Sequence, residues 1–351
     1  TDIADWSRQH TGFEKRYSFV NSVSAVDENV VWATSYDRKG LSTVNEVTRT
    51  TDGGATWQAI EIQNNEGLVN TCIHALDQNT AWVMNYWQYG SNPQGIYATT
   101  NGGITWSYQS TAAFDRSQGG FPNVVYFWDA NEGFCMGDPT NGYFEIYTTT
   151  DGGVNWTRVN QGDIPAPLSN EYGFTDNFSV VANTIWFGTN YGRVFKSENR
   201  GHSWSVIQTP LNGFFQVEFS TENNGLILQT NNHDLYETVD GGMTWQQIMY
   251  NGAVRSGDLE YVPGTTGTFV STGAQGLNAG ICFSADNGHT WNYYPETFGV
   301  HAGATDWVNE YTGWFGANNL DASEGGMWNS DFTAPEKVFN LNVNLEGPFN
   351  G

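Results

Sequence analysis

Short apolar runs recur along the whole chain, separated by turns rich in Gly and Asn. β-Branched and aromatic side chains dominate these runs, which is typical of buried strands. No stretch sustains the spacing of an amphipathic helix. The pattern therefore predicts an all-β chain. The runs are VVWAT at Trp32, AWVMN at Trp82, GFCMG at Phe134, IWFGT at Trp186, GLILQ at Leu226, TFVST at Phe269 and GWFGA at Trp314.

A six-residue phrase follows six of the seven runs, and each copy has Ser or Thr two places before it. Its Asp or Asn can accept hydrogen bonds from nearby backbone N–H groups, and its Gly supplies a positive φ. The Trp that ends it is a large apolar anchor. The first and last residues of the copies are Asp52 and Trp57, Asn101 and Trp106, Asp151 and Trp156, Asn199 and Trp204, Asp240 and Trp245, and Asp286 and Trp291.

The spacing of the phrase predicts a repeat architecture. Successive copies lie 49, 50, 48, 41 and 46 residues apart, the length of one four-stranded blade. Copies spread around a ring cannot converge on one substrate, so we interpret the phrase as a structural turn and not as a catalytic motif. The pattern [ST]-x-[DN]-x-G-x-x-W resembles the Asp-box (BNR) repeat. That repeat occurs in sialidases, xyloglucan hydrolases, sortilin-type receptors and photosystem II assembly factors of the Ycf48 type. The resemblance implies a β-propeller but no single function, because these relatives do unrelated things on one scaffold.

Seven runs against six phrases predict seven blades. The stretch GGMWNS near Trp328 supplies a strand of the seventh blade, and no phrase follows it. Trp6 lies 21 residues before Asp27, as Trp57 lies 20 before Asp77, so WSRQHTGF aligns with the outer strand of a blade. We therefore expect the N-terminal strand to close the last blade and remove the free sheet edges.

The expected domain is a single propeller over residues 1–330, followed by a surface tail or linker over 331–351. Residues 337–344 remain an alternative closing strand. The expected segments are 1–12 for the closing strand, about 17–62, 68–110, 122–160, 173–209, 213–250 and 256–295 for blades one to six, and about 300–330 for blade seven.

Composition narrows the classes of partner. The chain has 13 basic and 37 acidic residues, a formal charge of −24, which excludes a basic nucleic-acid footprint and disfavours anionic membranes. No apolar run is long enough for a transmembrane helix, so membrane insertion is not expected. The acidic, Lys-poor composition is typical of secreted or cell-surface proteins, and the start at TDIADW looks like a mature or trimmed product.

Cys72, Cys135 and Cys282 are expected as buried thiols, with a Cys72–Cys135 bridge as the alternative.

Two groups of candidate ligand-binding residues fall in loops expected on the face opposite the repeated phrases. Tyr86, Trp87 and Tyr89 form an aromatic group that could stack on sugar rings; the alternative is that these rings cover a neighbouring blade. A basic group could bind an acidic sugar or peptide, because Arg grips carboxylates with two hydrogen bonds; the alternative is a scattered, solvated set. Its members are Lys15, Arg16, Arg38, Lys39, Arg116 and Arg255.

A third group is acidic and offers the candidates for a catalytic role. Paired carboxylates could act as general acid and base, and the loop GDPTNG around Asp138 could hold Ca²⁺. No other cofactor and no dedicated metal site are expected. In a chain this acidic, carboxylates also reach loops by chance. The group comprises Asp115, Asp138, Asp163, Asp176, Asp258 and Glu260 in loops, with His74, Glu218, His301 and Asp306 on inner strands.

Together these features favour an extracellular binding or scaffold module for a glycan or protein partner. The alternative is a glycoside hydrolase or polysaccharide lyase acting on an extracellular polysaccharide. Resemblance to sialidases would require an Arg followed by Ile-Pro at the start of the first blade. The corresponding segment is KRYSFVNS, so Arg16 lacks that context and sialidase activity is disfavoured.

Overall fold

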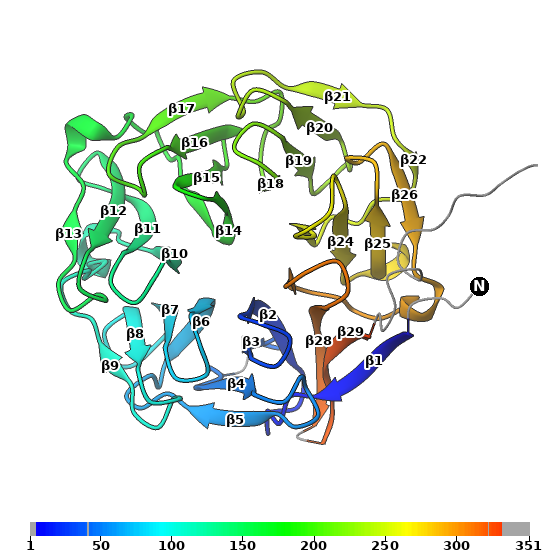
Figure 1. Cartoon of the computed structure of the whole chain (residues 1–351). Coiled ribbons are helices and arrows are strands. Elements are labelled where there is room, and N and C mark those ends of the chain that lie inside the picture. Colours follow the sequence, from blue (N-terminus) through cyan, green and yellow to red (C-terminus); the bar gives the residue numbers. More distant parts are fainter. Residues whose placement is uncertain (1–4, 41, 322, 332–351) are drawn as a thin grey trace, which may run out of the picture.

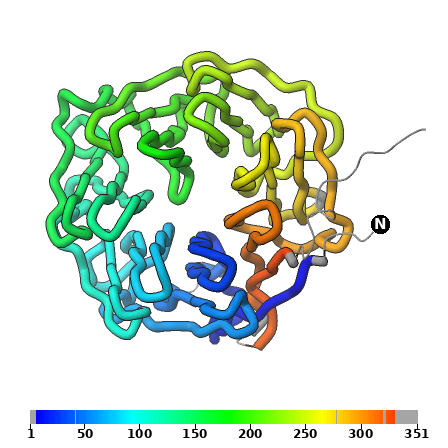
Figure 2. The backbone as a smooth tube through the Cα atoms, in the orientation of Figure 1, coloured from blue at the N-terminus to red at the C-terminus, as the bar shows by residue number. Residues whose placement is uncertain are grey.

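The computed structural model describes residues 5–40, 42–321 and 323–331, and these form a closed ring of antiparallel sheets around a central axis (Figures 1 and 2). Four of the sheets have four strands each in sequence order. They contain β6 (Leu68–Ala75), β7 (Ala81–Trp87), β8 (Gly95–Thr99) and β9 (Ser107–Tyr108); β10 (Pro122–Phe127), β11 (Gly133–Thr140), β12 (Tyr143–Thr149) and β13 (Thr157–Arg158); β14 (Gly173–Val181), β15 (Thr184–Thr189), β16 (Arg193–Ser197) and β17 (Ser205–Gln208); and β18 (Phe215–Phe219), β19 (Gly225–Gln229), β20 (Leu235–Thr238) and β21 (Gln246–Ile248).

A fifth sheet has an added edge strand that the sequence did not predict. Its order is β22-β26-β25-β24-β23, and β22 pairs with β26 in parallel. Its strands are β22 (Asn251–Gly252), β23 (Asp258–Tyr261), β24 (Phe269–Gly273), β25 (Gly280–Ser284) and β26 (Thr290–Tyr293). Short 3-10 helices interrupt the connections in the described chain at η1 (Arg116–Gln118), η2 (Gln161–Asp163), η3 (Gly276–Asn278) and η4 (Pro295–Thr297).

The remaining sheet joins the two ends of the described chain. Its order is β1-β29-β28-β2-β3-β4-β5, with β27 also paired to β28. β1 lies antiparallel to β29, with Trp6 opposite Ser330, so the N-terminal strand pairs with the last described strand. The pairing of Phe19 with Asn318 links the two halves of the sheet. The strands are β1 (Asp5–His10), β2 (Ser18–Ala25), β3 (Val31–Asp37), β4 (Glu46–Thr50), β5 (Gln58–Glu61), β27 (Thr305–Trp307), β28 (Gly313–Asp321) and β29 (Glu324–Asp331). The alternative strand expected at residues 337–344 lies outside the described residues. The same holds for the tail expected at residues 331–351, except for Asp331, which ends β29.

Aromatic side chains of the apolar runs tie neighbouring sheets together. Trp82 stacks on Phe127 with ring centroids 3.6 Å apart, and Trp186 stacks on Phe219 at 3.8 Å. In each pair the second ring belongs to the inner strand of the next sheet. The indole N–H of Trp186 donates to the backbone of Gly241 at 3.2 Å, so the buried polar atom is satisfied. Cys72, Cys135 and Cys282 are buried free thiols, and the alternative Cys72–Cys135 bridge is absent.

The six repeated phrases share one turn geometry. In the third copy, the Thr149 hydroxyl donates to the Asp151 carboxylate at 2.9 Å and accepts the backbone N–H of Gly153 at 3.0 Å. The same carboxylate accepts the backbone N–H of Asn155. Gly153 has φ 84°, and a Cβ there would meet the Gln109 side chain at 2.2 Å. The corresponding three hydrogen bonds are present in all six copies.

Replacing the hydroxyl of this turn is expected to destabilise the protein. Thr149→Val keeps the shape of the side chain but leaves the buried N–H of Gly153 without its acceptor. The free energy of unfolding should fall by about 1–3 kcal/mol. The neighbouring Thr150 is exposed, so Thr150→Val is the matched control and should change it by less than about 0.5 kcal/mol. Urea unfolding followed by tryptophan fluorescence measures both; equal effects would contradict the role assigned to the hydroxyl.

Candidate functional site

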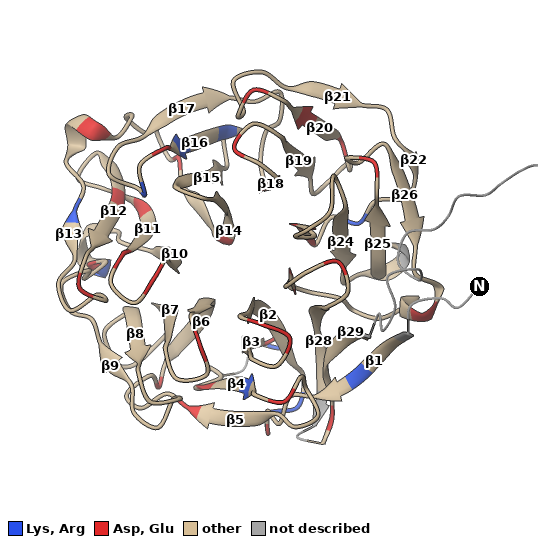
Figure 3. Ribbon diagram, viewed as in Figure 1, with Lys and Arg blue, Asp and Glu red and all other residues tan. Residues whose placement is uncertain are grey.

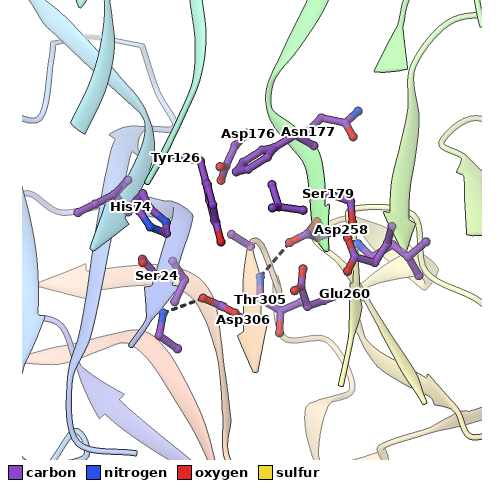
Figure 4. A pocket seen from close by; sticks show the side chains of 18 of the residues that line it. Ser24, His74, Tyr126, Asp176, Asn177, Ser179, Asp258, Glu260, Thr305 and Asp306 are labelled. Atoms are coloured by element: carbon purple, nitrogen blue, oxygen red, sulfur yellow. Dashed lines mark hydrogen bonds between the residues drawn. The ribbon is translucent and has the colours of Figure 1, made fainter. Parts of the chain in front are cut away.

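Titratable side chains gather in a cavity of about 390 Å³ at the centre of the ring (Figure 4). The inner strands β2, β6, β10, β14, β18, β23 and β27 all contribute to its wall. The acidic loops around the ring opening surround the same axis, while Lys and Arg lie further out, for example on β1, β13 and β16 (Figure 3). The described residues that line the cavity include no Lys or Arg.

Strand register explains which side chains reach the cavity. One residue of each inner strand faces the cavity, and each of these seven residues pairs with the equivalent residue of the second strand in its sheet. The seven residues therefore lie at the same height along the ring axis, which we call the common level. Five of the seven pairs are eight residues apart in the sequence. The pairs are Ser24–Trp32, His74–Trp82, Tyr126–Phe134, Ser179–Trp186, Glu218–Leu226, Glu260–Val270 and Asp306–Trp314.

Three neighbouring inner strands make one side of this level acidic. Glu218, Glu260 and Asp306 come from β18, β23 and β27, and Asp258 lies two residues before Glu260 on β23. The fifth carboxylate, Asp176, comes from an irregular part of β14 where the register shifts between Gly173 and Phe178. Asp176 has φ 53°, a left-handed conformation that places a non-glycine residue in a sparsely populated region.

The five carboxylates differ in their hydrogen bonds. Asp306 accepts the backbone N–H of Ala25 at 2.7 Å, and Asp258 accepts that of Thr305 at 2.9 Å. These bonds run from one inner strand to the next and so satisfy backbone groups at the strand edges. Glu260 differs, because its carboxylate accepts no hydrogen bond from the described residues. Figure 4 shows its oxygens directed into the cavity.

Burial and mutual repulsion favour the neutral form of these acids. Burial raises the pKa of Asp176 to about 7 and that of Asp258 to about 6. The pKa of Glu260 is raised well above its usual value by burial first and then by the charge of Glu218, and the pKa of Glu218 is raised likewise. The pKa of Asp306 is also raised, mainly by burial. The acids of the cavity are therefore either protonated and neutral or ionised, and in the ionised state the electrostatic potential of the cavity is strongly negative.

Aromatic groups form the opposite side. The rings of His74 and Tyr126 lie 4.3 Å apart, and Tyr126 extends from β10 into the cavity (Figure 4). His74 Nε2 is 2.8 Å from the carbonyl of Phe127, and burial lowers the pKa of His74 to about 4, so the ring is neutral near pH 7. The pKa of Tyr126 is raised by burial and by Asp306, while Arg200, which is not in the cavity wall, lowers it.

The structure separates the members of the predicted acidic group. It brings His74, Asp176, Glu218, Asp258, Glu260 and Asp306 together in the cavity. Asp115 instead accepts the N–H of Ser117 at the start of η1, and Asp163 is exposed in η2. His301 Nδ1 lies 3.2 Å from Arg38 Nη1, outside the cavity.

Asp138, the predicted Ca²⁺ candidate, lies on β11 and not in a loop. The GDPTNG segment is mostly strand, because β11 runs to Thr140 and β12 begins at Tyr143. The Asp138 carboxylate accepts hydrogen bonds from Asn123 at 2.8 Å and from the backbone of Gly173 at 3.2 Å, and burial raises its pKa to about 6. In the described part of the chain, no group of three or more His, Cys, Asp or Glu residues is arranged to hold a metal ion.

The three predicted aromatic residues lie against different neighbours. Tyr86, on β7, stacks on Phe121 with centroids 4.9 Å apart. Trp87 donates its indole N–H to the carbonyl of Gly90 and lies 3.6 Å below the guanidinium of Arg116. Tyr89 is 43% exposed. The ring faces of Tyr86 and Trp87 thus have partners within the chain, and their role in binding stays a prediction.

The predicted basic residues divide into separate places. Arg16 and Lys39 both lie over the ring of Tyr17, at 4.9 and 3.7 Å, and the backbone N–H of the adjacent Arg38 donates to the carbonyl of Tyr17. Arg116 lies with Trp87 in a different surface hollow. Arg255 lies over the ring of Tyr293 at 5.2 Å. A single site for all of them is therefore not formed.

Sequence reasoning missed Tyr126, Ser24 and Ser179 as cavity residues. The available signal was their spacing, since Ser24 and Tyr126 precede Trp32 and Phe134 of their apolar runs by eight residues. The spacing fails for Ser179 and Glu260, which lie seven and ten residues before their partners, so the full level was visible only in the strand register.

Comparisons with known proteins point to two kinds of propeller. No protein-family model matches the chain. The photosystem II assembly lipoprotein Ycf48 of Synechococcus sp. (strain CC9902) is 26% identical over 311 residues, 86% of this chain and 86% of that protein. The xyloglucanase Xgh74A of Acetivibrio thermocellus is 25% identical over 309 residues, 71% of this chain but only 34% of the enzyme.

Solved structures show the same fold. A structure of YCF48 bound to D1 peptide has a TM-score of 0.66 at 17% identity and covers 95% of this chain and 99% of that one. YCF48 from Cyanidioschyzon merolae has a TM-score of 0.67 at 14% identity and covers 94% and 100% of the two chains. The chain is thus an all-β protein with the fold of these β-propellers. In the described residues no helix is both long and apolar enough to span a bilayer.

Proposed function

We propose that this chain is a secreted or cell-surface binding module that holds a segment of a partner protein and catalyses no reaction. The likeness to Ycf48 carries the proposal, because it covers 86% of both chains and so extends well beyond the repeated turns. A propeller of the same fold has been solved with a bound peptide, which supports a protein partner. Fold alone does not fix function, so the partner's identity must come from experiment.

The proposal includes a finer account of the ring. We count seven blades of four strands, one of which carries β22 as a fifth strand, and the eight-stranded sheet is two blades joined at Phe19 and Asn318. The six turns around Asp52, Asn101, Asp151, Asn199, Asp240 and Asp286 are structural Asp-boxes in this account. Closure by β1 holds the ring shut without a free edge between the first and last strands.

The partner surface is proposed to lie on the loop face, at Tyr17 and the cations around it. Arg16 and Lys39 are exposed there, and both lie over the ring of Tyr17, which brings two cations to one place. An acidic or carboxylate-bearing peptide segment fits this surface, because exposed cations attract it and Arg can bind carboxylates through two hydrogen bonds. The similarity to the xyloglucanase keeps a glycan and its cleavage as the outcome that would replace this proposal.

The test is affinity capture with purified chain from the extracellular and surface fraction of its source, followed by titration of each captured protein in purified form. We expect one saturable protein partner, and a loss of affinity of at least tenfold in Arg16→Glu/Lys39→Glu. The matched control is Val154→Glu, at an exposed position of a turn that carries one of the repeated phrases, which should bind like wild type.

A parallel glycan array with EDTA and Ca²⁺ arms, followed by incubation of each hit, tests the alternative. Cleavage of a glycan would make the chain an enzyme and overturn the proposal. If Arg16→Glu/Lys39→Glu and the control Val154→Glu lost binding equally, the loop face would not be the binding site.

A further inference from the structure

The central cavity has a charge imbalance that nothing in its own wall offsets. Five carboxylates face it from β14, β18, β23 and β27, and no Lys or Arg belongs to the described lining. The other titratable groups that face it are the neutral His74 and the phenol of Tyr126. Ionised carboxylates at this density repel one another unless a cation or protons enter.

An unused hydrogen-bond acceptor makes an independent case for a ligand that donates. The Glu260 carboxylate lies inside the ring, is directed into the cavity and accepts no hydrogen bond from the described residues (Figure 4). Buried acceptors without donors are costly, so a donor-rich group is the complementary occupant.

An aromatic face lies across from the acids. Tyr126 projects toward Asp306, and its ring is backed by His74 (Figure 4). An aromatic face attracts a guanidinium or ammonium group, and a guanidinium carries five N–H donors in a planar fork. Carboxylates on one side and a Tyr ring on the other thus match both faces of a planar cation.

We propose that the cavity binds one organic cation, a guanidinium or ammonium group, between the carboxylates of Glu218, Glu260 and Asp306 and the ring of Tyr126. The group arrives either as an Arg or Lys side chain of a polypeptide or as a free small amine. This inference goes beyond the proposed function and is independent of the Tyr17 surface, so either can fail without the other.

Calorimetric titration at pH 8 tests it with four probes. N-acetyl-arginine methylamide represents a side chain and agmatine a free amine. N-acetyl-citrulline methylamide has nearly the shape of the first but no charge, and CaCl₂ represents a metal ion; all are compared at equal ionic strength. We expect the arginine probe or agmatine to bind at least tenfold more tightly than the citrulline probe, and the stronger of the two identifies the source.

Variants locate the site. Glu260→Gln should weaken the cationic probe at least tenfold while thermal unfolding shows an intact fold, and Asp306→Asn serves if that variant does not fold. Tyr126→Leu should weaken it severalfold. Asp115→Asn, a change at a carboxylate that does not line the cavity, should leave binding unchanged. Wild-type binding should fall at least tenfold at pH 5, where the cavity acids take up protons.

Three results would overturn the proposal. One is equal binding of the arginine and citrulline probes. Another is tighter binding of Ca²⁺ than of either organic cation, which would make the cavity a metal site. The third is no binding of any probe at millimolar concentration at pH 8, which would mean that protons alone balance the charge.

Discussion

Trp6→Ala is expected to lower the free energy of unfolding by about 3–5 kcal/mol, the cost of removing a large aromatic side chain from a core. Trp6 is 7% exposed and makes edge-on contacts with Tyr294, Trp307 and Phe315 at centroid distances of 5.7, 5.8 and 5.0 Å. It also belongs to β1, the strand that joins the two ends of the described ring. The variant therefore loses core packing and weakens the closure at the same place.

The same strand provides the control. Arg8 pairs with Glu324 at 3.3 Å, and both side chains are exposed, so Arg8→Ala should cost only about 0–1 kcal/mol. Urea unfolding at pH 7, followed by circular dichroism, compares the two variants with wild type. If Trp6→Ala were no more destabilising than Arg8→Ala, the N-terminal strand would not be part of the cooperative fold. A separate early transition for Trp6→Ala alone would show instead that closure is a local event.

Raising the pH from about 4 to about 7 is expected to lower the stability of the wild-type protein. In the unfolded chain, a cavity aspartate loses its proton near the ordinary pKa of 3.8, whereas the folded pKa is about 7 for Asp176 and about 6 for Asp258. Between these values the folded state holds protons that the unfolded state has released, so proton binding favours folding there. Each pKa unit is worth about 1.4 kcal/mol per carboxyl. The dependence should level off above the folded pKa values.

The carboxylates of the repeated turns titrate with the opposite sign. The turn carboxylates Asp52, Asp151, Asp240 and Asp286 have a lowered pKa because they accept hydrogen bonds. Their contribution is present above the ordinary pKa and is lost as the pH falls through the folded pKa. Stability should therefore decline on both sides of a maximum close to the ordinary aspartate pKa of 3.8.

Asp176→Asn isolates the contribution of one cavity carboxyl to the pH dependence of stability. The substitution keeps a side chain that suits φ 53° and can still hydrogen-bond with Ser22, one of the partners of Asp176. The slope between pH 4 and pH 7 should become shallower, and at pH 8 the variant should be more stable than wild type. Asp115→Asn, at the start of η1, should leave the slope unchanged. Thermal unfolding at half-unit pH steps provides the curves, and a variant parallel to wild type would show that Asp176 does not titrate between the two states.

The local structure of this protein could be predicted well from its sequence. Thr149, Asp151 and Gly153 define a turn whose hydrogen bonds involve residues at most four positions apart, so the same letters give the same geometry in six places. The apolar runs predicted buried strands for a similar reason, because alternation and β-branched residues act within one strand. The alignment of Trp6 with Trp57 led to the expectation of an N-terminal closing strand, and β1 does pair with β29.

The candidate site residues were harder to predict, because the type of a side chain does not show in which direction it points in the fold. Asp138 and Asp258 both looked like loop carboxylates, yet Asp138 bridges β11 to Asn123 and Gly173 while Asp258 faces the central cavity. By sequence alone Trp87 and Arg116 belong to separate groups of candidates, whereas in the structure the guanidinium of Arg116 lies over the ring of Trp87 at 3.6 Å. Such pairings depend on the register and curvature of strands from different sheets.

The sequence by itself thus determined the all-β repeat, the strands and the six turns, since these follow from interactions between residues close together in the chain. Only the tertiary structure decided which carboxylates meet. Glu218, Glu260 and Asp306 are more than forty residues apart in succession and become neighbours because the ring brings successive inner strands to one axis. Their shared charge, and the pKa shifts that result, arise from that convergence and from the exclusion of water at the centre of the ring.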